Sequence, residues 1–390
     1  MKLLTIHNRY LQRGGEDESR EAEDRLLNSH GHTIVEYIAD NKSIQRLYSI
    51  EVGLRSIWNQ SHYRHIRAMI REVSPDIVDV HNFFPLISPA VYYAARAEHK
   101  PVIQTLHNYR IVCPGATFFR EGRVCEDCAG RFLPWPALVH GCYHKDRKIT
   151  SAVAATMAVH WKIGTWTNRV NLYIALTQFS KKKFVEAGLP PDKIVIKPHF
   201  VPNDTGLGNG DGEYFVFIGR LSPEKGLDTL MSAWRALKIR SSLKIVGDGP
   251  LRREVAEFAS CTPGVEWLGV KNQAELFTII GRARALIVTS RWYETFCRVI
   301  IEAYSKGTPV IASDIGALAE LIEDGRTGAL FSAGNQEHLA ATIERFANSD
   351  LAVMRSEARR EYELKYTPNV NYRLMLDIYE RAIDASRRGD

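Results

Sequence analysis

Two glutamates, Glu294 and Glu302, stand eight residues apart at the ends of the mostly apolar stretch ETFCRVIIE. The residues before them, 285–290, predict a short buried strand, and Cys297 to Ser305 predict a helix that begins at its carboxyl end. Such a helix would point the N–H groups of Thr295 to Arg298 at whatever lies beyond the strand. A helical rise of 1.5 Å per residue would separate the two carboxylates by roughly 12 Å.

That separation fits a nucleotide sugar. One carboxylate would hold sugar hydroxyls, the helix amides would hold the diphosphate, and the second carboxylate would hold the ribose hydroxyls. The structural alternative is that one glutamate caps the helix and the other pairs with a nearby arginine.

A second group of residues supplies positive charge in the stretch GRLSPEKG. A strand is expected to end at Gly219, with Ser222 as a helix N-cap and Pro223 at the first helical position. Lys225 would then lie in the first helical turn, where the helix dipole disfavours a cation. With Arg220 beside it, this placement indicates a bound anion, although a solvated pair of charges remains the alternative.

The elements that must position these residues are short β-branched runs alternating with amphipathic helical patterns. Strands are expected at 2–7, 32–38, 76–81, 101–107, 171–177 and 192–197, and then at 214–219, 242–247, 265–269, 285–290, 308–313 and 328–331. Between the two series lies the Gly-, Asn- and Asp-rich stretch 200–213, a predicted linker. Two α/β halves predict two doubly wound parallel sheets, with ligands at the carboxyl ends of their strands.

Composition is consistent with this organisation. The chain has 390 residues, 45% hydrophobic and 25% charged, which is enough for two domains with full cores. A net charge of +6 suits an anionic ligand, nucleic acid or an acidic membrane surface. No stretch approaches 18 apolar residues, and the N-terminus lacks the apolar core of a signal peptide, so we expect a cytoplasmic protein with mostly reduced cysteines.

Four stretches of the second half together resemble the nucleotide-binding domain of the family 4 retaining glycosyltransferases, which have the GT-B fold and a Glu-x7-Glu signature. These stretches are GRLSPEKG, IVGDGPLRREV, VEWLGVKNQAEL and SRWYETFCRVIIEAYSKGTPVIASDIG. In the first half, NRYLQRGGEDES and NSHGHTIVEY resemble the glycine-rich opening loop of that family and the helix and strand that follow it.

The resemblance implies two Rossmann-like domains that face each other across a cleft. Residues 1–203 would form the N-terminal, acceptor-binding domain, with a cysteine-rich insert at 110–145. Residues 204–369 would form the nucleotide-sugar domain, and a C-terminal helix at about 370–390 would pack back on the first domain.

The resemblance also implies roles for single residues. Glu294 would contact the donor sugar, and His107 would lie near the reacting carbon, although a histidine at a strand end is more commonly part of the core. The diphosphate would lie against Arg220 and Lys225, the ribose against Glu302, and the base against the backbone near Gly269 and Val270. The full set of implied donor-binding residues is Gly14, Gly15, Arg220, Lys225, Gly269, Val270, Thr295, Phe296, Cys297, Arg298 and Glu302.

Two features depart from the family pattern. Thr295 and Cys297 flank Phe296 where the family usually has glycines, and Pro198-His199-Phe200 replaces a Pro-Asn-Gly turn. Added β-carbons narrow the approach of a donor to the backbone, so these changes bear most on donor identity.

The implied reaction moves a hexose from a UDP or GDP sugar with retention of configuration. The cationic site and helix N-termini could stabilise the leaving diphosphate without a metal. The sequence shows no well-placed nucleophile, so we do not expect a covalent glycosyl-enzyme intermediate. No Asp-x-Asp motif stands at a credible strand end; Asp76 and Asp79 bracket a strand, and we expect them in a loop and at an edge. A GT-B epimerase or phosphorylase is the first alternative, and a zinc-containing nucleic-acid-binding protein is the second.

The acceptor is expected to be a glycan or a lipid-linked saccharide, in bacterial cell-surface polysaccharide synthesis, and no nucleic-acid partner is expected. The stretch 58–73 mixes apolar and basic residues, a pattern compatible with an anionic membrane at the inner face of the cell membrane. Its members are Trp58, Ile66, Met69 and Ile70 with Arg64, Arg67 and Arg71. A surface helix with one buried face is the alternative.

Four of the six cysteines, Cys113, Cys125, Cys128 and Cys142, lie within thirty residues of one another. Cys125 and Cys128 form a C-x2-C knuckle in a glycine- and proline-rich segment that has little regular structure to hold it. The sequence therefore predicts a structural zinc that folds the insert, against the alternatives of unligated cysteines, disulfides or an iron–sulfur cluster.

Overall fold

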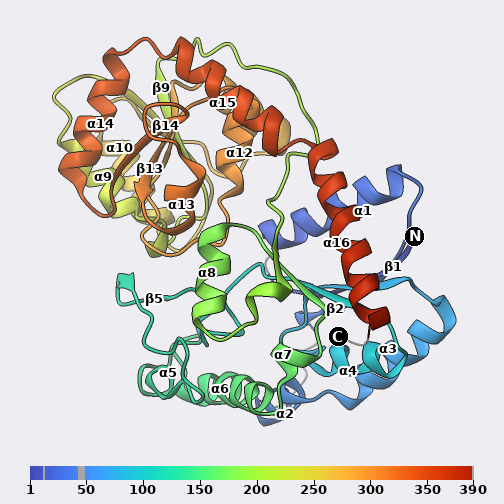
Figure 1. Cartoon of the computed structure of the whole chain (residues 1–390). Helices are drawn as coiled ribbons and strands as arrows, with labels where there is room; N and C mark the ends of the chain where they lie inside the picture. The colour runs from blue at the N-terminus through green and yellow to red at the C-terminus, as the bar shows by residue number, and fades with distance from the viewer. Residues whose placement is uncertain (12–13, 43–48, 389–390) are drawn as a thin grey trace. The chain divides into compact units, whose positions relative to one another are not determined.

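The computed structural model describes residues 1–11, 14–42 and 49–388, which form two compact units (Figure 1). Unit 1 contains Met1–Phe118, Cys125–Pro198 and the C-terminal stretch from Asn371. Unit 2 contains Phe119–Val124 and His199–Val370. The division therefore puts 199–203, which the sequence analysis assigned to the first domain, in unit 2.

Unit 1 is built on a parallel sheet with the strand order β2-β1-β3-β4-β7-β8. Its strands are β1 Lys2–Arg9, β2 Thr33–Asp40, β3 Ile77–Asn82, β4 Val102–Thr105, β7 Leu172–Ala175 and β8 Ile194–Ile196. Its helices are α1 Gly15–Ser29, α2 Ser49–Ile57, α3 Gln60–Val73, α4 Ala90–Ala97, α5 Trp135–His140, α6 Arg147–Lys162, α7 Thr165–Asn168 and α8 Gln178–Glu186, and α16 Pro368–Arg388 lies in this unit from Asn371 on.

Unit 2 is built on a second parallel sheet with the order β11-β10-β9-β12-β13-β14. Its strands are β9 Tyr214–Ile218, β10 Ser242–Val246, β11 Val265–Trp267, β12 Ala285–Val288, β13 Val310–Asp314 and β14 Gly328–Ser332. Its helices are α9 Leu227–Arg235, α10 Arg252–Cys261, α11 Gln273–Arg282, α12 Arg298–Ser305, α13 Gly316–Leu321, α14 Gln336–Asn348 and α15 Ala352–Lys365, and a short antiparallel hairpin pairs β5 Phe119–Arg120 with β6 Arg123–Val124.

The predicted α/β class with two doubly wound sheets is confirmed. Each of the twelve stretches predicted as strands overlaps one strand of these two sheets, with ends that differ by up to two residues. Local sequence is sufficient here because a β-branched run between turn residues fits a buried parallel strand better than any other element.

The stretch 200–213 has no regular secondary structure, as expected, but it is fixed to unit 2. The N–H groups of Gly208 and Gly210 donate to the carbonyl oxygens of Lys306 and Gly281, at 3.0 and 2.9 Å. A β-carbon on Gly208 would lie 2.2 Å from the Gly281 backbone, so glycine allows a close approach of two chain segments here.

Charged side chains penetrate the core of unit 1. Lys197 is completely buried and pairs with the buried Glu23 of α1, with Nζ and Oε1 2.5 Å apart. Arg20, also on α1 and buried, forms ion pairs with Asp24 and Glu36. Buried charges need such partners because their desolvation is costly.

The expectation that Asp79 lies at an edge is wrong. Asp79 is inside β3, between β1 and β4, and is 3% exposed. Its carboxylate accepts a hydrogen bond from the hydroxyl of Tyr379 on α16, at 2.9 Å. Asp76 does precede the strand, where its carboxylate accepts a hydrogen bond from the backbone N–H of Lys2.

Among the helices that the structure describes, none combines the length and apolar composition that a bilayer-spanning segment needs.

Candidate active site

The candidate site in unit 2 lies where the direction of the sheet topology reverses. The chain runs from β9 to β10 and β11 on one side of β9, and continues with β12, β13 and β14 on its other side. The loops that follow β9 and β12 therefore diverge at the carboxyl ends of neighbouring strands, which is the usual ligand-binding position in open α/β sheets.

The turn after β9 differs in one respect from the prediction. Pro223–Lys225 form a single 3-10 turn with Ser222 as its N-cap, and α9 begins only at Leu227. Lys225 therefore ends a 3-10 turn and does not lie in the first turn of an α-helix. The dipole of α9 therefore gives no reason to expect an anion beside Lys225.

Two backbone contacts hold this turn against the loop after β12. Gly226 has a φ of +67°, and a β-carbon on it would lie 2.0 Å from the carbonyl oxygen of Thr289, so glycine is required. The hydroxyl of Thr289 donates to the carbonyl oxygen of Lys225 at 2.7 Å, and the N–H of Arg291 donates to that of Glu224 at 2.9 Å. Residues that are far apart in the sequence are thus held in fixed relative positions.

Lys225 and Glu294 form an ion pair in this site, with Nζ and Oε1 2.6 Å apart. Their side chains are 23% and 8% exposed. The hydroxyl of Ser290 donates to the same Oε1 at 2.9 Å, and the Lys225 ammonium lies 5.5 Å from the centroid of the Trp292 ring. Burial acts to lower the pKa of Lys225, but the adjacent Glu294 carboxylate outweighs it and holds that pKa above its usual value. The lysine therefore carries its charge.

The predicted helix after Glu294 is confirmed as α12, which begins at Arg298 with Cys297 as its N-cap. The Cys297 side chain makes no capping hydrogen bond. Burial, with Glu294 next, raises the pKa of this thiol to about 12, so it is neutral. The N-terminus of α12 therefore carries no thiolate that would compete with an anionic ligand.

Glu302 lies one turn into α12 and pairs with Arg298, with the guanidinium and carboxylate 3.6 Å apart. Glu294 pairs with Lys225, as described above. Both carboxylates thus have cationic partners in this structure, as the structural alternative for Glu302 anticipated, and their roles toward a donor stay predictions.

The phenylalanine between the departing residues Thr295 and Cys297 contacts the second departure, the turn at His199. Phe296 is 8% exposed and lies edge-on to His199, with ring centroids 5.2 Å apart, and against Tyr366 at 6.3 Å. Phe296 and His199 therefore pack against each other inside unit 2, a contact that could not be predicted from their positions along the chain.

The remaining predicted donor contacts lie at the ends of the neighbouring strands. Arg220 is exposed in the turn after β9, and Val270, after β11, is 73% exposed. The carbonyl oxygen of Gly269 accepts a hydrogen bond from the N–H of Gly247 at 2.8 Å, which ties the loops after β11 and β10 together.

In unit 1 the order of strands reverses between β1 and β3, and α1 begins beside this point. Gly14 is the N-cap of α1 and Gly15 is its first residue, with open space where a Gly14 side chain would be. The Asp17 carboxylate accepts hydrogen bonds from the Gly14 N–H at 3.0 Å and from His7 Nε2 at 2.9 Å. Burial acts to raise the pKa of Asp17, but these hydrogen bonds hold it below its usual value, so the carboxyl is ionised.

Glu16 is a residue of this site that the sequence analysis missed. Its Oε1 is buried without a hydrogen-bond partner among the described residues, and His7 Nδ1, which likewise has none, lies 3.8 Å away. Burial raises the pKa of Glu16 to about 8, and the Asp17 carboxylate adds to the rise. A carboxyl that titrates near neutrality beside a strand end is typical of functional sites.

His107 follows β4 and contacts a second histidine that the sequence analysis did not single out. His81 Nδ1 and His107 Nε2 are 3.0 Å apart, and their rings are stacked. Burial, followed by the neighbouring His107, holds the pKa of His81 well below its usual value, so His81 is neutral. Asp79 lies behind His81, at 3.8 Å from its Nε2. His81 and His107 share one sequence feature, because each lies at or just beyond the end of one of two neighbouring strands, β3 and β4.

The four insert cysteines are all reduced and partly buried. Burial raises the pKa of Cys128 to about 12, and the other three thiols add to the rise, so the four lie in one neighbourhood. Within the described residues, however, no three His, Cys, Asp or Glu side chains converge in a geometry that could hold a metal ion. The arrangement therefore does not fit a zinc ion as it stands, and zinc stays a prediction.

Comparison with known families matches most of the chain. Residues 13–205 match the model described as Glycosyltransferase Family 4, and residues 212–349 match the model described as Glycosyl transferases group 1.

Curated relatives match mainly through shorter stretches. The GDP-mannose-dependent alpha-mannosyltransferase of Mycobacterium tuberculosis is 40% identical over 129 residues, which cover 33% of this chain and 32% of the relative. An uncharacterised glycosyltransferase of Methanocaldococcus jannaschii is 30% identical over 161 residues, covering 40% of this chain and 45% of the relative. The matched part thus spans less than half of each of these two relatives.

A solved structure extends the similarity over the whole fold. Anabaena HepE, crystallised with UDP and glucose, superposes with a TM-score of 0.69 over 97% of this chain and 100% of that one. At 18% sequence identity, this likeness bears on the fold.

Proposed function

The chain belongs to the family 4 glycosyltransferases of the GT-B fold, and from this premise we propose that it transfers a hexose from a UDP or GDP sugar to an acceptor hydroxyl with retention of configuration. The acceptor would be a glycan or a lipid-linked saccharide of bacterial cell-surface polysaccharide synthesis. The HepE crystal structure contains UDP and glucose, and the mycobacterial relative is named as GDP-mannose-dependent. The proposal therefore includes both UDP and GDP sugars as donors.

The observation that carries the proposal is the Lys225–Glu294 pair at the switch point of unit 2. Its ammonium lies in the turn after β9, and its carboxylate lies in the loop after β12, four residues before α12 begins at Arg298. We propose that the donor diphosphate binds between Arg220, Lys225 and the first turn of α12. Glu294 would orient the Lys225 ammonium and contact the sugar hydroxyls.

In the proposed reaction the bond between the anomeric carbon and the diphosphate oxygen breaks, and its electron pair leaves with the nucleoside diphosphate. The acceptor oxygen forms its bond to the same face of the sugar, and the hydroxyl proton passes to the departing diphosphate. Cations placed where negative charge develops favour the transition state over the bound donor.

We propose that no metal takes part in this chemistry, because lysine, arginine and helix amides can supply the positive charge. Transfer should persist in EDTA, and activity that is lost in EDTA and restored only by Mg²⁺ or Mn²⁺ would contradict this. A structural zinc on the four insert thiols would require them to rearrange. Metal analysis of protein purified without chelator should then find about one zinc per chain.

The test is incubation of the chain with a panel of UDP and GDP sugars, with release of the nucleoside diphosphate as the measurement. NMR of the sugar released to water or to an added saccharide would report retention or inversion. Interconversion of sugars without nucleotide release would favour the epimerase, and a requirement for inorganic phosphate would favour the phosphorylase. The Glu294→Gln chain is the control for nucleotide release by contaminants.

A further inference from the structure

Exposed apolar side chains are concentrated in one part of unit 1. Seven large apolar side chains with more than a third of their surface exposed lie between residues 132 and 163, against eight in all the rest of the described chain. The four that lie closest together in the sequence are Phe132, Leu133, Trp135 and Val139, which are 57%, 47%, 52% and 51% exposed. Covering these exposed apolar side chains would remove their surface from water, which is favourable in free energy.

This segment is ordered by its own contacts. The N–H groups of Arg131 and Ala137 donate to the carbonyl oxygens of Cys128 and Pro134, at 3.2 and 3.1 Å. The thiol of Cys128 lies 3.8 Å from the same Pro134 oxygen. Because the loop is held in this way, its apolar side chains are presented to solvent by a fixed backbone.

Positive charge predominates in the same stretch of the chain. Between residues 128 and 163 the chain has five lysines and arginines and one acidic residue, Asp146. The Asp146 carboxylate is engaged at the N-terminus of α6, where it accepts hydrogen bonds from the N–H groups of Lys148 and Ile149. The guanidinium of Arg131 lies 5.8 Å from the Trp135 ring, so charge and aromatic surface are adjacent.

We propose that this surface, which we call the α5 surface, binds an anionic lipid bilayer. It comprises Phe132, Leu133, Trp135 and Val139 with Arg131, Lys145, Arg147 and Lys148. Aromatic rings would enter the headgroup region, and the lysine and arginine side chains would reach the lipid phosphates.

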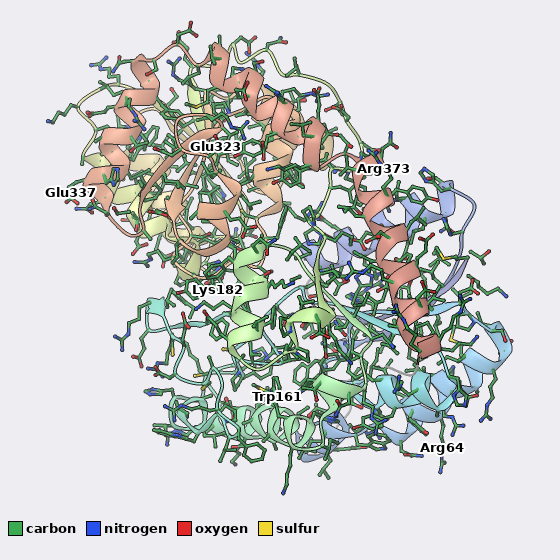
Figure 2. All side chains as sticks on the ribbon, in the orientation of Figure 1. Arg64, Trp161, Lys182, Glu323, Glu337 and Arg373 are labelled. Carbon is green, nitrogen blue, oxygen red and sulfur yellow. The ribbon has the colours of Figure 1, made fainter. Side chains whose placement is uncertain are left out.

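The position differs from the helix that the sequence analysis indicated. Ile66 and Ile70 of α3 are 0% and 1% exposed, so its apolar face belongs to the core. Arg67 and Arg71 both pair with Glu98, at 2.6 and 2.9 Å. Figure 2 labels Arg64, which lies on the same helix α3. The proposed surface lies instead on α5 and α6, which pack against each other along one side of unit 1 (Figure 1).

A second copy of this chain is the alternative partner for the α5 surface, but the positive charge of that surface disfavours it. A two-fold interface would bring the same surface of both copies together, and so place the basic group Arg131, Lys145, Arg147 and Lys148 of one copy near that of the other. Like charges across an interface are costly, whereas an anionic bilayer complements them.

The proposal goes beyond glycosyl transfer, and its test needs neither donor nor acceptor. The full chain would be sedimented with vesicles of phosphatidylcholine alone and with vesicles of equal parts phosphatidylcholine and phosphatidylglycerol. We expect binding to the second kind, reduced in about 0.5 M NaCl because exposed charges are screened. Equal binding to both kinds, or binding to neither, would overturn the proposal.

Variants locate the surface. Phe132→Ser/Leu133→Ser/Trp135→Ser should weaken binding to the anionic vesicles at least about tenfold, since three apolar contacts are removed. Lys145→Gln/Arg147→Gln/Lys148→Gln should do the same, at about fivefold per charge near the surface. The matched control is Val353→Ser/Leu364→Ser on α15, where the side chains are 79% and 59% exposed, and it should bind as the unchanged chain does.

Circular dichroism would establish that each variant is folded, which the exposure of the altered residues favours. The charge variant tests the proposal separately if the apolar variant fails to fold. Light scattering in lipid-free buffer would detect self-association. If the apolar variant dissociates an oligomer but binds vesicles unchanged, the surface is an interface between copies and the proposal is wrong.

Discussion

The two units share a six-stranded parallel sheet, but they bury charge in different places. In unit 1, Lys197 pairs with Glu23 of α1 and Arg20 of α1 pairs with Asp24, and Lys197, Glu23 and Arg20 are 0%, 2% and 2% exposed. In unit 2, the apolar side chains from β9 to β14 form a continuous core, and the Lys225–Glu294 pair lies beyond the strand ends.

This difference separates two uses of a charged side chain. A charged side chain at a strand end can bind a ligand, because the ligand can replace its ion-pair partner. A charge inside the core has no such exchange available, so it must be paired permanently within the fold. Loss of the first kind should therefore affect activity, and loss of the second kind should affect stability.

The largest expected effect is on the buried pair of unit 1. Lys197→Met should lower the free energy of unfolding by about 3–5 kcal/mol, because it leaves the Glu23 carboxylate buried and unpaired. Chemical denaturation followed by circular dichroism would measure it. The double variant Glu23→Leu/Lys197→Met should lose less than the single one.

The matched control is an exposed pair of unit 2, Arg282–Asp211, whose side chains are 56% and 52% exposed. Arg282→Met should cost less than about 1 kcal/mol. Equal losses for Lys197→Met and Arg282→Met would show that burial does not distinguish the two units.

The next effect tests the exchangeable pair. Glu294→Gln should lower turnover by about 100- to 1000-fold, the scale for removing one group that stabilises the transition state. Lys225→Ala and Glu302→Ala should mainly raise the donor KM. Because Lys225 and Glu294 contact each other, their double variant should lose less than the sum of the single losses.

Steady-state kinetics with the donor identified by the panel would measure these changes. Small and equal effects of Glu294→Gln, Lys225→Ala and Glu302→Ala would contradict the proposed placement of the donor.

A smaller effect should depend on pH and involves Glu16. Its pKa is raised from 4.5 to about 8, so between these values the folded chain holds a proton that the unfolded chain has lost. The free energy of unfolding should therefore fall as pH rises from about 4.5 to 8. Relative to the unchanged chain, Glu16→Gln should be more stable at pH 9 by roughly 1–3 kcal/mol, and about equal at pH 5.

Denaturation at pH 5, 7 and 9 would measure this difference, at values chosen to span the window. His7, Asp17 and Arg110 face Glu16 and contribute their own charges, so the comparison is made against Glu18→Gln, an exposed change on the same helix. A Glu16→Gln chain that shows the same pH dependence as Glu18→Gln would contradict the assignment.

The smallest effect concerns the contact of His199, in the turn that departs from the family pattern, with Phe296. A double-mutant cycle with His199→Ala and Phe296→Leu should give a coupling of about 0.5–1.5 kcal/mol in stability, typical of an edge-on aromatic pair. If the two single changes in the free energy of unfolding simply add in the double variant, the two side chains do not interact energetically.

The sequence by itself determined the strands of the two sheets and the family. All twelve strands of the two large sheets overlap stretches predicted from β-branched runs, and α12 begins next to the predicted Cys297. These features depend on residues that are adjacent along the chain, so local patterns are sufficient to identify them.

Only the tertiary structure decided which side chains meet. Lys225 and Glu294 are 69 residues apart in the sequence, and Lys197 and Glu23 are 174 apart. The contacts of His81 with His107, and of Phe296 with His199, likewise join separate segments. Such pairs are set by strand order and by the close approach of backbones, which neither side-chain type nor spacing along the chain specifies.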